Sequence, residues 1–418
     1  MSACEFFKTL VFSNLNLKDI SLNNLSETFE IENNVSITKQ SLDEKFDNES
    51  IEFVKRLLSI LIEQTIYEKV ENLGGILEQF ESVRIKDSTS FKLSKNMAEK
   101  YRASSKNTEQ SILKIQHEYD LKTGKIYDIS LHSFIESDSK DAVSNMENIN
   151  KNDLIIRDLG YVTLFAMEAI IIKEAYFLNR FDYTTNAYET QTSTQKIDFA
   201  KIQEYLKKYQ LPHIEKEVFI GDKQRLPVRM IIELLPENEI EKRLRKLKRR
   251  ESRSRKCYSK EFRAILRLNI YVTNISKEKL SIENVRQIYR LRWQIELVFK
   301  AWKSIGKIEK IKKMKPERIE TMLYAKLILL VLCNQIFWNT TQDFQKYENQ
   351  SLSIYKTFKT LINNVKEIKT AIKQGLQSMN ELFKILIKII CIKCKLEKKK
   401  NTDSSMEIMR LKNNTKNA

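Results

Sequence analysis

One stretch of the sequence holds a single carboxylate among cations. The segment YRLRWQIELVFKAWK, residues 289–303, alternates large apolar side chains with polar ones. On a helix at roughly 100° per residue, the polar side chains fall within about 80° of one another. They are Tyr289, Arg292, Glu296, Lys300 and Lys303. The helical wheel leaves two interpretations open: an ordinary amphipathic helix with Glu–Lys pairs, or a stripe aimed at a defined place for a chemical purpose.

The spacing within this stripe is more specific. Tyr289, Arg292, Glu296 and Lys303 follow the pattern Y-x2-R-x3-E-x6-K. The pattern resembles the signature of the YREK transposases of bacterial insertion sequences, the insertion-sequence-4-like family of DDE transposases. The resemblance implies a ribonuclease-H-like fold in which Glu296 is the third catalytic acid. It also implies that Tyr289, Arg292 and Lys303 contact transposon-end DNA, and Lys300, which lies in the same stripe, is a further candidate.

The resemblance requires two aspartates upstream. Asp87 in RIKDSTSF is followed by Ser-Thr, similar to the family's Asp-Gly-Thr on the first sheet strand, with Ser in place of Gly. Asp158 in LIIRDLGY is followed by Leu-Gly-Tyr, as at the family's second acid. The resemblance therefore implies that Asp87, Asp158 and Glu296 are the catalytic residues and the metal ligands.

The reaction explains why three acids are needed. Phosphodiester hydrolysis and transfer place negative charge on the attacking and the leaving oxygen, and two divalent ions roughly 4 Å apart stabilise both. Mg²⁺ prefers hard oxygen ligands such as carboxylates. The resemblance thus implies two Mg²⁺ ions, with Mn²⁺ as an alternative, held by Asp87, Asp158 and Glu296.

The elements that position the acids form a mixed α/β domain. The hydrophobic pattern predicts strands and helices in an order that begins with three antiparallel strands. The expected elements are a strand at 82–93, a hairpin at 112–134 turning at KTGK, a helix at 138–149, a strand at 153–158, a helix at 162–174 and a strand at 175–181. The expected fold class is α/β, with a ribonuclease-H-like mixed-sheet catalytic core that a β-rich insertion interrupts and with helical N- and C-terminal regions.

Six regions are expected along the chain. They are a helical N-terminal DNA-binding region (1–79), the first part of the core (80–181), an insertion with a basic run (182–265), the second part of the core (266–315), a helical C-terminal region (316–395) and a mobile tail (396–418). Within the insertion, we expect a helix at 198–208 and strands near 217–222 and 228–235. A strand at 264–275 leads into the second part of the core. Within the first region, DNES at 47–50 is expected to cap a long helix. A plain structural bundle is an equal alternative for that region.

The charge of the chain points to a polyanionic partner. The net charge is +18, and residues 241–256 alone hold ten Lys or Arg and two Glu. Such a segment favours phosphate binding, although a solvated helix face is the alternative. The candidate DNA-binding residues in it are Lys242, Arg243, Arg245, Lys246, Lys248, Arg249 and Arg250.

Cysteine usage and hydropathy indicate a cytosolic protein. Five scattered Cys do not form a disulfide framework, and Cys391 and Cys394 lack the further ligands of a zinc site. The apolar run 327–338 is too short to span a bilayer, and no secretory signal is expected. We expect a cytoplasmic, nucleoid-associated bacterial protein without a membrane partner.

The function implied by the resemblance is cut-and-paste transposition of an insertion sequence. The protein would bind terminal inverted repeats, cleave DNA strands in a metal-dependent reaction and transfer them to target DNA, as a homodimer. Two alternatives remain open. One is a non-enzymatic end-binding protein derived from an inactive or domesticated transposase, and the other is a host nuclease of the same fold.

Overall fold

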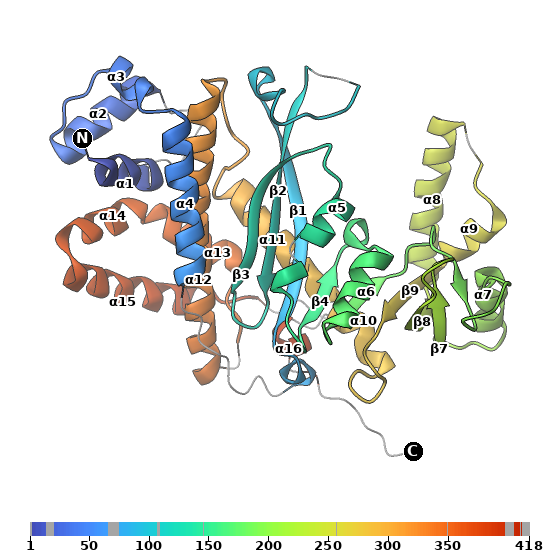
Figure 1. The fold of residues 1–418 in the computed structure, drawn as a ribbon. Helices are drawn as coiled ribbons and strands as arrows, with labels where there is room; N and C mark the ends of the chain where they lie inside the picture. The colour runs from blue at the N-terminus through green and yellow to red at the C-terminus, as the bar shows by residue number, and fades with distance from the viewer. Residues whose placement is uncertain are drawn as a thin grey trace. The chain divides into compact units, whose positions relative to one another are not determined.

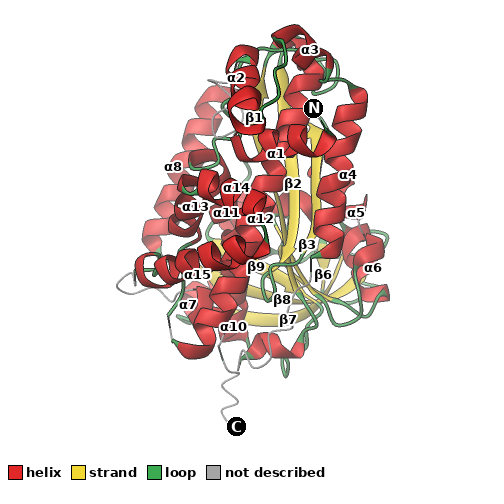
Figure 2. Ribbon diagram, turned by 90° about the vertical axis from the view of Figure 1, so that its left-hand side faces the viewer, coloured by secondary structure: helices red, strands yellow, loops and turns green. Residues whose placement is uncertain are grey.

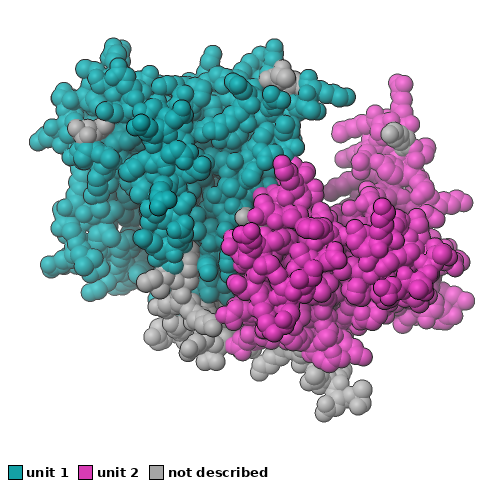
Figure 3. Space-filling model, viewed as in Figure 1, with its two compact units in different colours: residues 1–71, 87–136, 293–406 teal, residues 72–86, 137–292, 407–418 magenta. Residues whose placement is uncertain are grey.

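The computed structural model describes residues 2–13, 21–65, 75–106, 109–144, 146–255, 257–348, 350–397, 405–409 and 411. Two compact units make up the chain, and Figure 3 distinguishes them by colour. The first unit contains residues 1–71, 87–136 and 293–406, and the second contains residues 72–86, 137–292 and 407–418. Each unit is thus assembled from segments that are far apart in the sequence.

The described strands form one mixed sheet, drawn as arrows in Figure 1. They are β1 (Val83–Leu93), β2 (Ser111–Asp120), β3 (Ile126–Ser133), β4 (Leu154–Arg157), β5 (Tyr176–Arg180), β6 (Ala187–Tyr188), β7 (His213–Ile220), β8 (Leu226–Leu234) and β9 (Leu268–Thr273). Their order is β3-β2-β1-β4-β5-β9-β8-β7-β6, and β1 contributes residues to both units. The sheet and its helices confirm the predicted α/β, ribonuclease-H-like fold class.

Most of the predicted strands and the hairpin are confirmed. β1 runs parallel to β4, and β4 runs parallel to β5, as expected for strands linked by helical crossovers. β2 and β3 form the predicted antiparallel hairpin. In the insertion, β7 and β8 do not form a separate sheet. They extend the sheet beyond β9 through antiparallel pairing, so the basic helix that follows β8 is connected to the same sheet.

The first unit contains most of the helices at the two ends of the chain. They are α1 (Ala3–Ser13), α2 (Leu22–Asn33), α3 (Lys39–Glu44), α4 (Asn48–Gln64), α11 (Gln294–Ser304), α12 (Pro316–Tyr347), α13 (Ile354–Asn363), α14 (Val365–Gln374) and α15 (Leu376–Lys393). Helix α4 lies beside α12 (Figure 1). Asp47 caps α4 and forms a capping box with Ser50, which confirms the cap predicted at DNES.

Helix α12 is the apolar centre of the first unit. Among the residues that the structure describes, its segment Pro316–Phe344 is the one helix long and apolar enough to cross a membrane. However, 78% of its most apolar window is buried inside the structure. Burial of this kind is typical of the core helix of a folded domain.

Aromatic packing fixes α11 against β2 in the first unit. The His117 ring lies 5.0 Å from the Trp302 ring and 6.2 Å from the Phe299 ring. Trp302 is fully buried. At the β2–β3 turn, Gly124 has a φ of +76°, and a Cβ there would lie 2.2 Å from Trp338. Glycine is therefore required at this turn by both its backbone conformation and the close approach of α12.

The helices of the second unit cover its part of the sheet. They are α5 (Asp138–Ser144), α6 (Leu164–Ile172), α7 (Phe199–Lys208), α8 (Glu237–Ser254), α9 (Lys260–Ile265) and α10 (Ile282–Arg290). Helices α5 and α6 contact each other and lie side by side (Figure 2). Residues of α5, α6 and α7 share one core with β4, β5, β8 and β9, and Ala142, Ile155 and Phe177 belong to it. Packing on this core holds β4 and α5 in place beneath the site residues.

Three expectations differ from the structure in detail. The helix predicted at 138–149 ends at Ser144 and is followed by the 3₁₀ turn Met146–Asn148. The strand predicted at 264–275 is only Leu268–Thr273, because α9 and its C-cap occupy the preceding residues. Most of the predicted mobile tail lies outside the described residues, as do residues 14–20 and 66–74 of the N-terminal region. Among the described tail residues, Ser405–Met409 form a short helix, α16, in which Ile408 and Met409 are buried.

Candidate functional site

The signature segment is not one continuous helix, as the helical wheel assumed. Helix α10 ends at Arg290, a 3₁₀ turn, η5, spans Leu291–Trp293, and α11 begins at Gln294. A 3₁₀ turn advances about 120° per residue, so it rotates the later side chains relative to the earlier ones. The boundary between the two units falls within this turn, after Arg292. The polar stripe is therefore divided into an α10–η5 part and an α11 part.

In the second unit, the structure brings three of the predicted site residues together at the end of β4. Asp158 follows the last residue of this strand. The Arg292 Nε lies 3.6 Å from the Asp158 Oδ1. The Tyr289 hydroxyl donates a hydrogen bond of 3.5 Å to the Arg157 carbonyl, one residue before Asp158. The Arg292 side chain is 16% exposed and that of Asp158 is 46% exposed, so the carboxylate remains accessible beside its cation.

Burial controls the protonation of Tyr289. Its side chain packs edge-on against the Tyr271 ring at 5.4 Å. Burial raises the pKa of Tyr289 to about 12, with nearby Arg292 acting in the opposite direction and Asp158 adding to the increase. The phenol is therefore a neutral hydrogen-bond donor at physiological pH, and it cannot serve as a general base there.

The other predicted site residues belong to the first unit. Asp87 lies on β1, where its Oδ1 accepts a 2.8 Å hydrogen bond from the Ser88 amide. Lys303 on α11 donates a 2.9 Å hydrogen bond to the Ser90 carbonyl of the same strand. Lys300 is exposed, with its Nζ 5.9 Å from the Tyr355 ring centre. Lys303 thus attaches the helix that carries Glu296 to the strand that carries Asp87.

The donor chemistry of the three acids suits a hard divalent cation. Asp87, Asp158 and Glu296 are each partly exposed and supply carboxylate oxygens, which Mg²⁺ and Mn²⁺ prefer. The acids are divided between the units, with Asp158 in the second and the other two in the first. Within the described part of the chain, no group of three or more His, Cys, Asp or Glu side chains is close enough to hold a metal ion.

The basic run forms helix α8, and its cations differ in their surroundings. Arg243 donates hydrogen bonds to the carbonyls of Leu266 and Leu268 and to the Asn269 side chain, and burial lowers its pKa. Lys242 and Arg245 pair at 2.6 and 2.7 Å with glutamates on the same helix. Arg243 therefore fastens α8 to β9, and the other two have an acid beside them.

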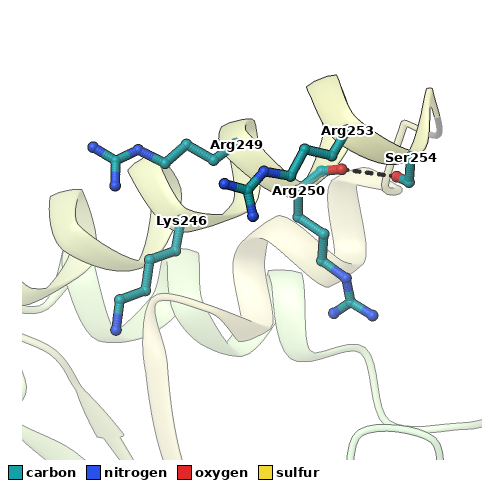
Figure 4. A pocket seen from close by; sticks show the side chains of 5 residues that line it. All are labelled: Lys246, Arg249, Arg250, Arg253 and Ser254. Atoms are coloured by element: carbon teal, nitrogen blue, oxygen red, sulfur yellow. Dashed lines mark hydrogen bonds between the residues drawn. The ribbon is translucent and has the colours of Figure 1, made fainter. Parts of the chain in front are cut away.

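A second group of cations lines a pocket of about 400 Å³ on one face of α8 (Figure 4). Lys246, Arg249, Arg250 and Arg253 stand at helical spacing i, i+3, i+4 and i+7, and Ser254 completes the lining. None of these cations makes an ion pair with a residue that the structure describes. The group is called the α8 cation face below.

Sequence reasoning overlooked Arg253 as a member of this face. Arg253 lies in the basic run but was not among the candidate residues. Lys248 was a candidate residue, but its exposed side chain does not line the pocket. The spacing of four residues from Arg249 to Arg253 was the available signal. Net charge alone could not distinguish the α8 cation face from the paired and buried cations.

Comparison with known proteins gives the family. The family model described as "Transposase DDE domain" matches residues 78–332. The transposase for insertion sequence element IS231F from Bacillus thuringiensis subsp. israelensis is 29% identical, covering 84% of this chain and 76% of that protein. The transposase for insertion sequence element IS1151 from Clostridium perfringens is 27% identical, covering 98% and 90%. A piggyBac transposase synaptic complex with hairpin DNA is 9% identical, with a TM-score of 0.44, covering 96% of this chain and 77% of that one.

The family match spans more than half of the 418 residues, and the similarity to the two insertion sequence transposases extends over most of the chain. It includes the strand of Asp87, the strand end at Asp158 and the whole signature segment, so the predicted site residues all lie within it. The chain therefore belongs to the family of transposases with a DDE domain.

Proposed function

We propose that this transposase moves an insertion sequence by cut-and-paste transposition, with Asp87, Asp158 and Glu296 as its catalytic acids. The observation that carries the proposal is the grouping of Asp158, Tyr289 and Arg292 at the end of β4. Asp158 is far from Tyr289 and Arg292 in the sequence, yet the fold brings the three together. Their residue types match an acid with phosphate-binding neighbours. An exposed carboxylate beside a guanidinium is expected where a metal ion and a phosphate bind together.

The metal chemistry follows from the donor set. Transposases of this family use divalent metal ions, and we propose two Mg²⁺ ions, with Mn²⁺ as a substitute, held by the three acids. Bound ions of this kind stabilise the charge on the attacking and leaving oxygens of the phosphodiester. The chain's own side chains then orient the substrate: the Arg292 guanidinium binds a phosphate oxygen, and the neutral Tyr289 hydroxyl exchanges its acceptor, the Arg157 carbonyl, for another phosphate oxygen.

The α8 cation face supplies a separate phosphate contact in this proposal. Its side chains are exposed, and none of them makes an ion pair with a residue that the structure describes, so a phosphate can bind there and release the counterions of the DNA without breaking an ion pair. Lys242, Arg245 and Lys248 remain weaker candidates on the same helix. Lys300 and Lys303 are proposed to contact transposon-end DNA as part of the signature segment.

The partners are the terminal inverted repeats of the element and the target DNA. We propose a homodimer in the synaptic complex, since two ends must be joined in one reaction. The proposed place of action is the bacterial cytoplasm at the nucleoid. Helices α1 and α4 pack on α12, and we propose that the outer surface of the N-terminal helices also binds DNA.

Cleavage of a matched substrate tests the function. Purified protein is incubated with Mg²⁺ and a duplex carrying the terminal repeats, and strand nicks are mapped at the element boundary. Asp87→Ala, Asp158→Ala and Glu296→Ala should each abolish cleavage and leave binding of the duplex within about twofold. Full cleavage by any of these variants would disprove the assignment of the acids.

The same assay separates the alternatives. Binding without cleavage by the unaltered protein would indicate an end-binding protein. Cleavage that does not depend on the repeat sequence would indicate a nuclease of the same fold. Boundary-specific nicks followed by joining of the 3′ ends to a second duplex support transposition.

A further inference from the structure

Three buried cations lie on the first residues of β1 and on β4, all within the second unit. Arg84 and Lys86 are fully buried, and Arg157 is 2% exposed. Alternation along a strand places Arg84 and Lys86 on the face opposite to Ile85, and Arg157 on the face opposite to Ile156. Because β1 and β4 pair in parallel and both faces of such a pair are normally buried, these cations occupy positions where apolar side chains are usual. A specific set of partners must therefore compensate their burial.

Helix α5 provides partners for the last two of these cations. The Lys86 Nζ lies 2.6 Å from the Asp141 Oδ2, and Asp141 is 7% exposed. The Arg157 Nη1 donates a 2.8 Å hydrogen bond to the Ala142 carbonyl. That carbonyl belongs to the last turn of α5, where the carbonyl oxygens have no N–H donor within the helix and a cation is favoured. Adjacent residues of one helix thus bind a cation from each of two strands.

The two cations are also partners in the sheet register. Lys86 stands opposite Arg157 in the parallel β1–β4 pair, and it is the last pair of that ladder. The residue after Lys86 is Asp87, and the residue after Arg157 is Asp158. Each proposed catalytic aspartate therefore directly follows a cation that is bonded to α5.

Helix α5 also approaches the chain on the other side of Asp158. A Cβ added to Gly160 would lie 3.2 Å from the Asp138 Oδ2, so the first residue of α5 is close to the turn after the acid. A second buried ion pair, Arg84 with Asp153, lies further along the chain from the proposed catalytic aspartates. The Arg84 Nη1 is 3.6 Å from the Asp153 Oδ2 and donates a 2.7 Å hydrogen bond to the Asn148 carbonyl.

We propose that Lys86, Asp141 and Arg157 are positioning residues that fix the last pair of the β1–β4 ladder, and with it the direction of the Asp87 and Asp158 carboxylates. This inference rests on the proposed function of the two aspartates. Supporting groups behind metal ligands typically change metal affinity or activity about 10- to 100-fold when they are replaced. The buried pair is expected to act on metal binding in this range, and not on the affinity for DNA.

The test replaces the pair with apolar side chains of similar size. Removal of one partner would leave a buried charge, so Lys86→Met alone can fail to fold, whereas Lys86→Met/Asp141→Leu removes both charges. The matched control is Arg84→Met/Asp153→Asn, which removes the other buried pair of the same strands. Asparagine at 153 keeps an acceptor for the Ser82 hydroxyl, which now bonds to Asp153 at 2.7 Å.

Two readouts are compared with the unaltered protein bound to terminal-repeat duplex. The first is the Mg²⁺ concentration that gives half of the metal-induced rise in the unfolding temperature, which reports metal binding without catalysis. The second is the Mg²⁺ concentration for half-maximal cleavage. For Lys86→Met/Asp141→Leu, both should rise by about 10- to 100-fold, with duplex affinity within about twofold. The control variant should keep both concentrations within about threefold.

Unchanged Mg²⁺ requirements in Lys86→Met/Asp141→Leu would overturn the inference, and so would an equal increase in the control variant. Failure of the proposed function has a different signature. In that case Asp87→Ala and Asp158→Ala would bind Mg²⁺ and cleave as the unaltered protein does, whatever the pair variants show.

Discussion

Replacing Arg249 and Arg253 together with glutamine should weaken binding to a terminal-repeat duplex by about 60-fold in about 0.1 M salt. Both arginines lie on the α8 cation face and lack an ion-pair partner in the described part of the chain. Each phosphate contact contributes about 0.9 to the slope of log affinity against log salt concentration. Loss of two contacts therefore lowers the slope by about 1.8, which corresponds to about 60-fold at a salt concentration tenfold below 1 M.

The matched control removes the same number of charges from the same helix. Lys242→Gln/Arg245→Gln takes away two cations that now pair with Glu239 and Glu241. A phosphate would have to displace these carboxylates, so the slope should change by less than about 0.5. Fluorescence anisotropy of a labelled duplex, titrated between about 50 and 200 mM salt, measures both slopes. An equal decrease in the two variants would mean that α8 binds through its total charge, and the assignment of a binding face would be refuted.

Three further predictions concern stability. Arg243→Met should lower the free energy of unfolding by about 2 kcal/mol in chemical denaturation, because three acceptors lose a charged donor; a value near zero would contradict its structural role. Gly124→Ala should lower the free energy of unfolding by about 3 kcal/mol, because the added methyl group clashes with Trp338 and the positive φ is strained. Gly375→Ala, with open space around it, should lower it by about 1 to 2 kcal/mol. Equal losses of the two variants in thermal unfolding would argue against the clash. Burial raises the pKa of Tyr289 from 10.0 to about 12, so its contribution to stability is complete below pH 10 and is lost as the pH rises toward 12; denaturation of Tyr289→Phe across this range should show a smaller decrease than the unaltered protein.

The signature spacing was a better guide to the family than the helical wheel. The wheel treated residues 289–303 as one helix and placed Tyr289 on an exposed polar stripe. In the structure η5 interrupts the helix, and Tyr289 is 9% exposed because its ring packs on Tyr271. A single 3₁₀ turn has no clear sequence signal, so periodicity could not reveal it. The spacing led to the family that the family model also gives, because it depends on residue types at fixed positions and not on an assumed helix geometry.

The charge pattern predicted a phosphate-binding segment, but it could not show which of its cations make ion pairs or are buried. The density of Lys and Arg at 241–256 predicted phosphate binding, and in the structure most of that segment forms α8. Which cations remain available depends on contacts made far along the chain, such as those of Arg243 with residues 266–269. Tertiary contacts of this kind are not encoded in local composition.

The buried cations of β1 and β4 show the same limitation at the site itself. In the sequence, VRIKD is a strand with one apolar and one polar face, and the polar face would be assigned to solvent. Arg84 and Lys86 are nevertheless fully buried, because the segment from α5 to Asn148 covers that face and supplies acceptors. An apolar residue at position 86 would pack there without any bond to α5, and the strand end would lose its link to the helix that also binds Arg157. A strand that only needed burial could have used such a residue, so the retained charge pair is better explained by the position that it imposes than by the stability that it contributes.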